Sequence, residues 1–376
     1  MTMSLPMCSI DFTNDEMGAE EQAIADRISE LKAILGDDLL ILGHHYQRDQ
    51  IVMHADLLGD SFMLSEMAAA SSAKNIVFCG VHFMAESADI LTRDDQRVIL
   101  PNLKAGCSMA DMAVLNEVEL AWTDILEQTG LKDPIDKSED GSFLIPVTYM
   151  NSSAELKDFV GRHGGVVCTS SNAVGILEWA YERAGPKGAV LFFPDQHLGR
   201  NTALKMNIPH SKMAVWTPGQ VNEMPEGVKI VLWHGFCSVH KRFTIEQIDD
   251  FRSKHPSGLV VVHPECPFEI VEAADANGST QFIRNYVTQQ APGSHIAIGT
   301  EINMVARLDK EHDNLSVECL DDSVCPCSTM YMIHPVFLMD VLERIVEGEN
   351  PNQISVPKEV AAGAKIALDR MLAIKQ

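Results

Sequence analysis

Leu315-Ser-Val-Glu-Cys-Leu-Asp-Asp-Ser-Val-Cys-Pro-Cys327 reads as a short strand that runs into a loop bearing thiols. Two earlier stretches have the same form, Arg97-Val-Ile-Leu-Pro-Asn-Leu-Lys-Ala-Gly-Cys107 and Lys229-Ile-Val-Leu-Trp-His-Gly-Phe-Cys237. Each of them places a cysteine a few residues beyond an apolar run. Because one pattern at three places in a chain signals an internal repeat, these stretches predict a protein built from three related units.

The segments around these stretches repeat as well. Apolar runs that end in polar residues open three rounds, at Leu39–Tyr46, Phe143–Tyr149 and Leu259–Glu265, and helical segments alternate with strands after each of them. This alternation is typical of parallel α/β sheets. A serine then opens a later helix in each round: Ser61 stands 15 residues after Tyr46, Ser170 19 residues after Asn151, and Ser279 14 residues after Glu265. The longer second round predicts an insertion between His197 and Val228.

The length of the chain also favours several domains, because 376 residues exceed the size at which a single core stops growing. We expect three of them, at residues 1–122 with an N-terminal extension, 123–240, and 241–376 with a C-terminal helical tail. Ligands of open parallel sheets bind beyond the carboxyl ends of the strands. Around a pseudo-threefold axis, the polar strand ends of three sheets would line one central cavity, and the three thiols would cap one side of it.

The composition is that of a soluble globular protein, with 46% hydrophobic and 22% charged residues. The net charge of -24 disfavours a nucleic-acid partner, because phosphate backbones bind to clustered Lys and Arg. The sequence has no run of eighteen apolar residues and no basic, apolar leader, so it predicts a cytoplasmic protein that does not enter a membrane. A small anionic substrate would need local positive potential, which helix N-termini supply.

The thiols favour a metal site over a disulfide, since a cytoplasmic chain keeps its cysteines reduced. The last cysteines have the spacing C-x5-C-x-C, which matches neither the C-x2-C pairs of structural zinc sites nor the cysteine runs of ferredoxins. Their partners are therefore expected in the other two rounds. Three thiolates fit either zinc with a water ligand or a 4Fe-4S cluster with one open iron, and the composition does not decide between these.

Nine short motifs, in order along the chain, resemble those of the quinolinate synthase family. They are Gly43-His-His-Tyr-Gln47, Gly59-Asp-Ser61, Lys104-Ala-Gly-Cys-Ser-Met-Ala-Asp111, Tyr149-Met-Asn-Ser-Ser-Ala-Glu155, Cys168-Thr-Ser-Ser-Asn-Ala173, Phe193-Pro-Asp-Gln-His-Leu-Gly199, His263-Pro-Glu-Cys266, Gly278-Ser-Thr280 and Gly299-Thr-Glu301. The chain departs from the family at His45, where many members carry Asn, and Cys325 marks the longer subgroup with three cysteines near the end.

The resemblance implies three homologous three-layer α/β/α domains around a central site that holds one 4Fe-4S cluster per chain. It implies that iminoaspartate condenses with dihydroxyacetone phosphate to give quinolinate, phosphate and two waters, a step of de novo NAD synthesis. L-aspartate oxidase is then a candidate transient partner as the source of the imine. The cluster ligands implied by motif position are Cys107, Cys237 and Cys327, the last because Met330 follows it by three residues.

The resemblance and the chemistry of the side chains suggest a role for each site residue. Tyr46 would carry a proton, His44 and His263 would donate to substrate oxygens, and Glu265 would act as general base or acid. Tyr149 and Asn151 would frame the planar product. The residues expected to bind the carboxylates and the phosphate are Ser61, Ser170, Ser279 and Thr280, and Met330 is expected to touch the substrate.

Other interpretations of the same residues stay open. Any one of the serines is by itself a simple helix N-cap. His240 is expected to adjoin the metal ligands without being one, and His197 and Glu301 are candidates that the motifs leave undecided. A disulfide between Cys325 and Cys327 would disable the cluster. The rival functions are a zinc-dependent lyase or aldolase and an iron-sulfur sensor, the second disfavoured because no basic helix-turn-helix region is present.

Overall fold

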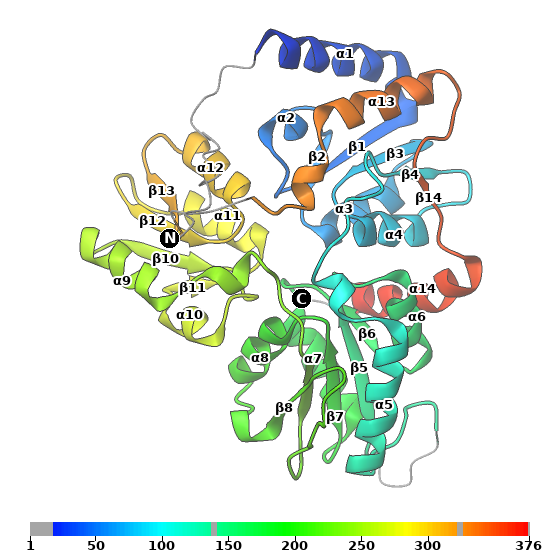
Figure 1. Ribbon diagram of the computed structural model, residues 1–376, viewed down its shortest axis with the longest axis vertical. Coiled ribbons are helices and arrows are strands. Elements are labelled where there is room, and N and C mark those ends of the chain that lie inside the picture. The colour runs from blue at the N-terminus through cyan, green and yellow to red at the C-terminus, as the bar shows by residue number, and fades with distance from the viewer. Residues whose placement is uncertain (1–17, 137–140, 322–325, 375–376) are drawn as a thin grey trace, which may run out of the picture.

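The computed structural model describes residues 18–136, 141–321 and 326–374, and its backbone forms three sheets of mainly parallel strands (Figure 1). The strand orders are β14-β4-β3-β1-β2, β6-β5-β7-β9-β8 and β11-β10-β12-β13. The strands are β1 Leu39–His44, β2 Leu57–Gly59, β3 Asn75–Cys79, β4 Arg97–Ile99, β5 Leu144–Tyr149, β6 Val166–Cys168, β7 Ala189–Phe193, β8 Met213–Trp216, β9 Ile230–Trp233, β10 Leu259–Val262, β11 Ala276–Asn277, β12 His295–Gly299, β13 Ser316–Cys319 and β14 Gln353–Ile354.

Helices connect the strands in each unit. They are α1 Ala19–Leu35, α2 Asp49–Val52, α3 Ser61–Ala70, α4 His82–Leu91, α5 Leu115–Thr129, α6 Ala154–Arg162, α7 Ala173–Ala184, α8 Gln196–Lys205, α9 Ile245–Lys254, α10 Phe268–Ala273, α11 Thr280–Thr288, α12 Ile302–Glu311, α13 Pro335–Val346 and α14 Lys358–Ala373. Within the described residues, no helix is both long and apolar enough to span a membrane.

The three units share one sheet topology. In each, the first strand lies between the second and the third, the fourth lies beyond the third, and all these pairs are parallel. Two further strands extend this common core at its edges, β8 beside β9 and β14 antiparallel to β4. Because β8 lies within residues 197–228, it accounts for the predicted insertion in the second round. The predicted α/β class with three α/β/α units is confirmed.

The third unit shows how the sequence produces three layers. Val260 and Val262 of β10 pack with residues of α9 and α10, whereas Val261 packs with residues of α11 and α12. Successive side chains of a strand point to opposite faces, so a strand covered on both faces is apolar throughout. The continuous apolar runs seen in the sequence are therefore the buried strands of a sheet between two helical layers.

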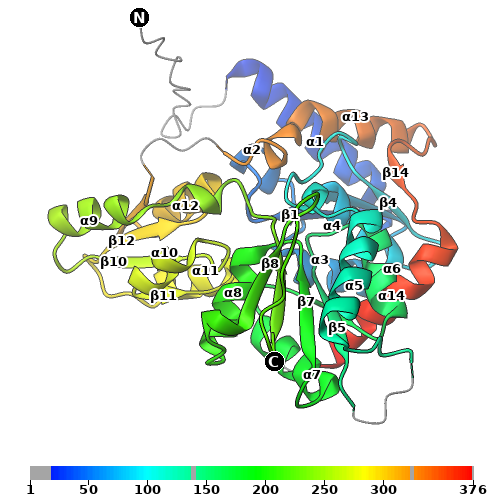
Figure 2. The ribbon, with the colours of Figure 1, turned by 60° about the horizontal axis from the view of Figure 1, so that its bottom comes forward.

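The C-terminal tail closes the chain back on its beginning. Helix α13 packs against α1, β14 joins the edge of the first sheet, and α14 packs against α6 of the second unit (Figures 1 and 2). The tail expected to be helical thus also contains a strand, and it contacts the first and second units. The first and second sheets are in this way joined by the last residues of the chain.

The helices α5, α9 and α13 indicate where the units divide. Leu115, Ile245 and Pro335 each stand eight residues after Cys107, Cys237 and Cys327, respectively. The predicted boundary after residue 122 falls inside α5, and the one after residue 240 falls inside the 3-10 helix His240–Arg242. We propose that the boundaries lie just before α5 and α9, a few residues from the predicted positions, which stay predictions. Of the predicted N-terminal extension, residues 1–20, the first seventeen lie outside the described residues, and α1 begins at Ala19.

Two glycines set the close approach of α6 and α14. A Cβ added to Gly161 would collide with the backbone carbonyl of Gly363, whereas one added to Gly363 would chiefly meet the side-chain carboxylate of Asp158. We expect Gly161→Ala to lower the free energy of unfolding by about 1–3 kcal/mol, because backbone atoms of packed helices cannot move aside. Gly363→Ala is the matched comparison and should cost less, since the Asp158 side chain can rotate. Denaturant unfolding of both variants tests this, and an equal loss in both would contradict it.

Candidate active site

The three thiols occupy the same turn in each unit. Each cysteine follows the fourth core strand and precedes a 3-10 helix, at Ala110–Met112, His240–Arg242 and Met330–Met332. In every case the carbonyl of the cysteine accepts a hydrogen bond from the backbone N–H four residues on. The donor-acceptor distances are 3.0 Å from Asp111 to Cys107, 3.0 Å from Lys241 to Cys237 and 2.9 Å from Tyr331 to Cys327. Three identical turns therefore present three thiols in the same manner.

This repeated turn favours Cys327 as the thiol of the third unit. Cys327 precedes its 3-10 helix by three residues and α13 by eight. Cys107 and Cys237 precede their 3-10 helices, and α5 and α9, by the same intervals. Cys325 lies outside the described residues, and with it the predicted disulfide to Cys327. The remaining cysteines of the described chain, Cys79, Cys168, Cys266 and Cys319, do not line the pocket that the three thiols share.

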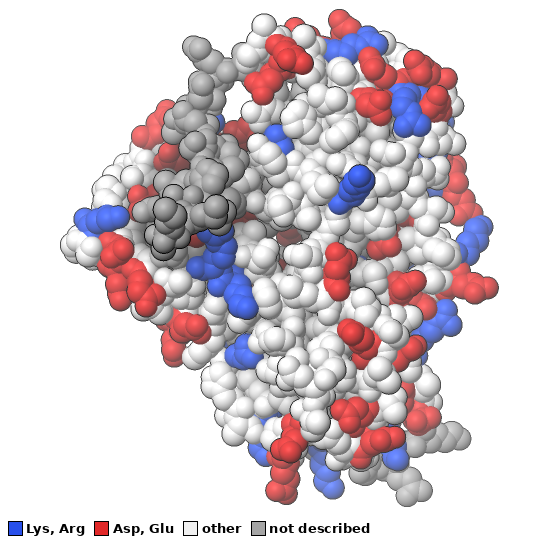
Figure 3. Space-filling view, in the orientation of Figure 1, with Lys and Arg blue, Asp and Glu red and all other residues white. Residues whose placement is uncertain are grey.

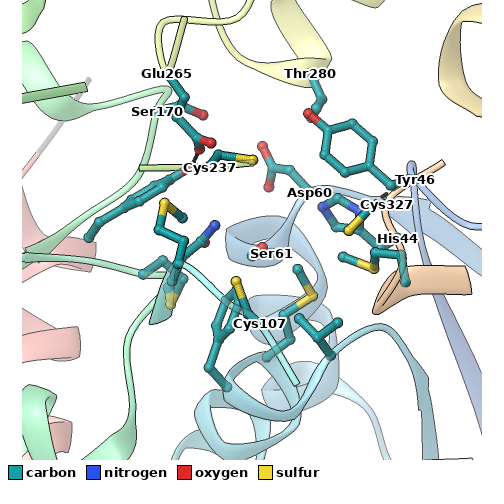
Figure 4. Close-up of a pocket in the computed structure, with 18 of the residues that line it drawn as sticks. His44, Tyr46, Asp60, Ser61, Cys107, Ser170, Cys237, Glu265, Thr280 and Cys327 are labelled. Atoms are coloured by element: carbon teal, nitrogen blue, oxygen red, sulfur yellow. Dashed lines mark hydrogen bonds between the residues drawn. The ribbon is translucent and has the colours of Figure 1, made fainter. Parts of the chain in front are cut away.

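The thiols face one pocket at the centre of the three units. Figure 4 shows the sulfur atoms of Cys107, Cys237 and Cys327 directed into it from three sides. The other predicted site residues that line this pocket are His44, Tyr46, Ser61, Tyr149, Asn151, Ser170, His263, Glu265, Thr280 and Met330. The structure thus gathers all but one of the predicted residues around the thiols, and the exception is Ser279.

Burial controls the charge of the thiols. It raises the pKa of Cys107 to about 12, and it also raises the pKa values of Cys237 and Cys327. The proximity of the thiols to one another raises the pKa values of Cys107 and Cys237 further. Without a metal ion the three groups are therefore neutral. A bound metal must displace their protons, so its affinity depends on pH.

Polar pairs occupy equivalent strand ends in the three units. They are His44 with Tyr46, Tyr149 with Asn151, and His263 with Glu265. In the first and third pairs, the backbone N–H of the second residue donates to the histidine Nδ1, over 3.1 Å in Tyr46 and 3.3 Å in Glu265. An accepting Nδ1 leaves the proton of a neutral imidazole on Nε2. Both histidines can therefore donate a hydrogen bond through Nε2.

The hydroxyl that matches Ser61 in the third unit is Thr280. His44 pairs with Gly59 and Tyr149 with Cys168, and the hydroxyls of Ser61 and Ser170 follow two residues later. In the third unit Val262 pairs with Asn277, so the next residue, His263, stands opposite Gly278. The residue two positions after Gly278 is Thr280, not Ser279. Ser279 instead caps α11, where its Oγ accepts the N–H of Phe282 over 3.3 Å. The predicted role of Ser279 in binding substrate is not supported by this placement and stays a prediction.

Thr280 is poised for a ligand. Its Oγ1 is buried and has no hydrogen-bond partner in the part of the chain that the structure describes. Buried hydroxyls are normally paired, so an unpaired one that faces a pocket indicates a place where a ligand atom belongs. Thr280 is also the first residue of α11, and the N-terminus of a helix favours negatively charged ligands.

A hydrogen-bonded chain of five side chains crosses the pocket wall. The Tyr46 hydroxyl bonds to Thr300 Oγ1 over 2.7 Å, and Thr300 Oγ1 lies 3.1 Å from His240 Nε2. His240 Nδ1 lies 2.8 Å from Glu265 Oε2. Tyr149 completes the chain by donating its hydroxyl to Glu265 Oε1 over 2.7 Å. The two predicted proton carriers, Tyr46 and Glu265, are therefore linked through a histidine and a threonine.

The environment sets which members of this chain carry a proton. Burial opposes ionisation of Glu265, but His263, His240 and the bond from Tyr149 outweigh it and lower its pKa to about 2. Burial raises the pKa of Tyr46 and of Tyr149 well above the usual value, and the charge of Glu265 raises both further. Burial also lowers the pKa of His263 to about 3 and that of His44 well below its usual value. At neutral pH Glu265 is therefore a carboxylate, whereas Tyr46, Tyr149, His44 and His263 are neutral.

Some residues of the site were missed or left undecided by the sequence. His240, expected only beside the ligands, is a member of the hydrogen-bonded chain. Thr300 lies inside the quoted Gly299-Thr-Glu301 motif, and Asp60 directly precedes Ser61, where it caps α3 and lines the pocket. Glu301 is fully buried and does not line the pocket, although its carboxylate accepts the N–H of Cys327.

Basic and acidic side chains are both spread over the face of the molecule drawn in Figure 3. Figure 3 shows acidic side chains on all three units and a line of basic side chains along the seam between the second and third units. A cleft between α8 and α10 is lined by His197, Arg200, His210 and Lys241. His197 therefore faces this cleft and does not line the central pocket. Glu246 and Glu269 line the same cleft, so the charges of Arg200 and Lys241 are matched there by two carboxylates.

The residues present fit a metal centre in two ways. The three thiols would hold one from three units, which leaves any further coordination position to a substrate. A second set consists of Cys237, His240 and Glu265, whose ligand atoms lie within 4.8 Å of one another. Occupation of this second set would compete with the bonds that join His240 to Glu265 and Thr300. The first set needs no such loss.

Comparisons with known proteins agree with the motifs. The model of the family described as quinolinate synthetase A protein (NadA) matches residues 26–373. A quinolinate synthase of Corynebacterium glutamicum is 53% identical over 363 residues, which cover 95% of this chain and 89% of that protein. A quinolinate synthase of Rhodopirellula baltica is 49% identical, and the match covers 95% of this chain and 92% of that protein. A quinolinate synthase of Bacillus velezensis is 44% identical, and the match covers 99% of this chain and 98% of that protein. The chain therefore belongs to the quinolinate synthetase A family and is an enzyme.

Proposed function

We propose that the chain condenses iminoaspartate with dihydroxyacetone phosphate to quinolinate, phosphate and two waters, in de novo NAD synthesis. The observation that carries this proposal is the meeting of three equivalent thiols and three equivalent hydroxyls at one buried pocket. The names of the relatives give the product, and the pocket offers groups suited to anionic substrates. An imine hydrolyses readily in water, so an enzyme that makes it, such as L-aspartate oxidase, is proposed as a transient partner.

Cys107, Cys237 and Cys327 would hold a 4Fe-4S cluster. Three thiolates leave one iron of such a cluster open, and that iron supplies a Lewis acid for loss of a hydroxyl group. The pocket walls around the thiols include Val81, Met109 and Met150, which keep bulk water away from the centre.

The chain's own residues would bind and orient the substrates. Ser61, Ser170 and Thr280 lie at equivalent strand-to-helix turns, where a hydroxyl and a helix N-terminus together attract a carboxylate or a phosphate. His44 and His263 would donate through Nε2 to substrate oxygens. Tyr149 and Asn151 would flank the planar ring of the product, and Met330 would pack against it.

Proton transfer would use the hydrogen-bonded chain between Tyr46 and Glu265. Carbon-carbon bond formation by the enamine form of iminoaspartate expels phosphate, and an isomerisation must follow before the nitrogen closes on the carbonyl. Glu265, a carboxylate at neutral pH, would take the proton for that isomerisation. Tyr46, which stays protonated, would return one, and His240 with Thr300 would carry protons between them.

A zinc-dependent lyase is the second candidate, because Cys237, His240 and Glu265 lie close enough to hold one ion. Metal analysis separates the two. We expect anaerobically purified protein to contain about four irons and four acid-labile sulfides per chain. Cys107→Ser, Cys237→Ser and Cys327→Ser should each lose the cluster and its visible absorption, while Cys325→Ser, the control, should keep both. Zinc without sulfide would refute the cluster.

Glu265→Gln tests the base. Loss of the carboxylate should lower kcat by about 100- to 10,000-fold, the usual contribution of a general base. The metal content should remain normal, because Glu265 is not among the proposed ligands. Glu269→Gln, an exposed neighbour on α10, serves as the matched control in steady-state assays of quinolinate formation. Normal turnover by a Glu265→Gln enzyme with a full complement of metal would rule out the assignment.

Thr280→Val compares a ligand-binding hydroxyl with a capping one. The substitution removes an unpaired hydroxyl and keeps the shape of the side chain, so KM for at least one substrate should rise about tenfold or more, as expected for a bond to a charged group. Ser279→Ala should instead lower the free energy of unfolding by about 1 kcal/mol, through loss of the α11 cap, with little change in KM. The reverse pattern would return the binding role to Ser279.

A further inference from the structure

Two buried carboxylates outside the pocket lie at equivalent positions in the second and third units. Asp195 stands two residues after the end of β7, and Glu301 stands two residues after the end of β12. Both side chains are fully buried, and neither lines the central pocket. Burial of a carboxylate is costly unless it accepts several hydrogen bonds. We therefore expect each of the two to have specific hydrogen-bond donors.

Each carboxylate joins a helix to a thiol loop. One oxygen caps the helix that follows the third strand: Asp195 Oδ1 accepts from the N–H of Leu198 over 2.7 Å, and Glu301 Oε2 from that of Asn303 over 2.8 Å. The other oxygen accepts the backbone N–H of the thiol residue in the same unit. This distance is 3.2 Å both from Cys237 to Asp195 Oδ2 and from Cys327 to Glu301 Oε1.

The first unit lacks this connection. The residue equivalent to Asp195 and Glu301 is Val81, which stands two residues after the end of β3 and precedes α4. Its apolar side chain cannot accept a hydrogen bond from the loop that carries Cys107. The three thiol loops therefore share one backbone turn but differ in how they are held: two by a buried carboxylate and one without it.

Glu301 has a further contact that reaches the proton-carrying tyrosine. Its Oε1 also accepts from the side-chain amide of Asn303 over 2.8 Å, and that amide donates to the backbone carbonyl of Tyr46 over 3.4 Å. Arg307 of the same helix donates to the carbonyl of Gln47 over 3.1 Å. The loop of Cys327 and the loop of Tyr46 are thus fixed against one helix, α12.

We propose that Asp195 and Glu301 are positioning residues that fix the loops of Cys237 and Cys327 for metal binding, and that Cys107 is the least constrained of the three ligands. The inference rests on the proposed thiol ligands of the preceding section. In a preorganised pair, two thiols are held in place before the metal arrives, and the third closes on it afterwards. Loss of a contact that holds a metal ligand usually weakens metal binding about 10- to 100-fold.

The test measures each thiol separately. The metal-loaded protein is treated anaerobically with a ferrous-iron chelator in the presence of an alkylating reagent, and the labelling rates of Cys107, Cys237 and Cys327 are read by peptide mass spectrometry. In the wild-type chain Cys107 should be labelled first. Asp195→Asn should speed the labelling of Cys237 about tenfold or more with little effect on Cys327, and Glu301→Gln should do the opposite.

Three comparisons keep the test decisive. Ser153 caps α6, where its Oγ accepts a hydrogen bond from the N–H of Leu156. Ser153→Ala removes this cap and should change none of the three labelling rates selectively. Asp195→Glu, which retains a carboxylate, should restore part of the protection of Cys237. Equal acceleration of all three thiols in both variants would show general loosening of the fold and would overturn the proposal, as would labelling of Cys107 last in the wild-type chain.

The same labelling of the metal-free full-length chain separates this inference from the function proposed above. Absence of an iron-sulfur cluster from the purified protein would refute that function. The dependence of Cys237 on Asp195, and of Cys327 on Glu301, would still be decided by the relative labelling rates. A selective pattern supports the anchoring role, and a uniform one refutes it.

Discussion

The site depends on one geometric constraint: three thiols that follow strands of three separate sheets must face one pocket. A parallel sheet gathers its strand ends at one edge, and three such edges face one another here because the units share one topology. Each unit then contributes a polar strand end, a hydroxyl at a helix start and a thiol. None of the units can build the pocket alone, so the contacts between units are part of the site.

The sequence predicted most of this arrangement because the repeat could be counted. The strands, the thiols and the pairs at the strand ends follow from apolar runs and spacing alone. The sequence did not distinguish Ser279 from Thr280, because two adjacent hydroxyls follow the very short strand β11 and a count from Glu265 does not show which of them caps the helix. Strand β14 was missed since its partner, β4, lies some 250 residues away in the chain.

The hydrogen-bonded chain could not be found by counting either. Tyr46 belongs to the first unit, His240 to the thiol loop of the second, and Thr300 and Glu265 to the third, so no sequence interval relates them. Their protonation also follows from packing: burial keeps His44 and His263 neutral, and the hydrogen bonds of His240 and Tyr149 to Glu265 favour its ionised form. The described lining of the pocket contains no Lys or Arg, so the anionic substrates proposed above would be bound by neutral donors and helix ends.

The return of the C-terminal tail to the first unit has a consequence for how the protein is made. Domains fold in the order in which they leave the ribosome. The first sheet, however, receives its edge strand β14 only after all three thiol loops have been synthesised, and Cys327 with α13 emerges shortly before it. The first two units can begin to fold early, but the pocket cannot be complete until Cys327 and the elements after it have emerged. Closure of the pocket therefore follows the synthesis of all three units.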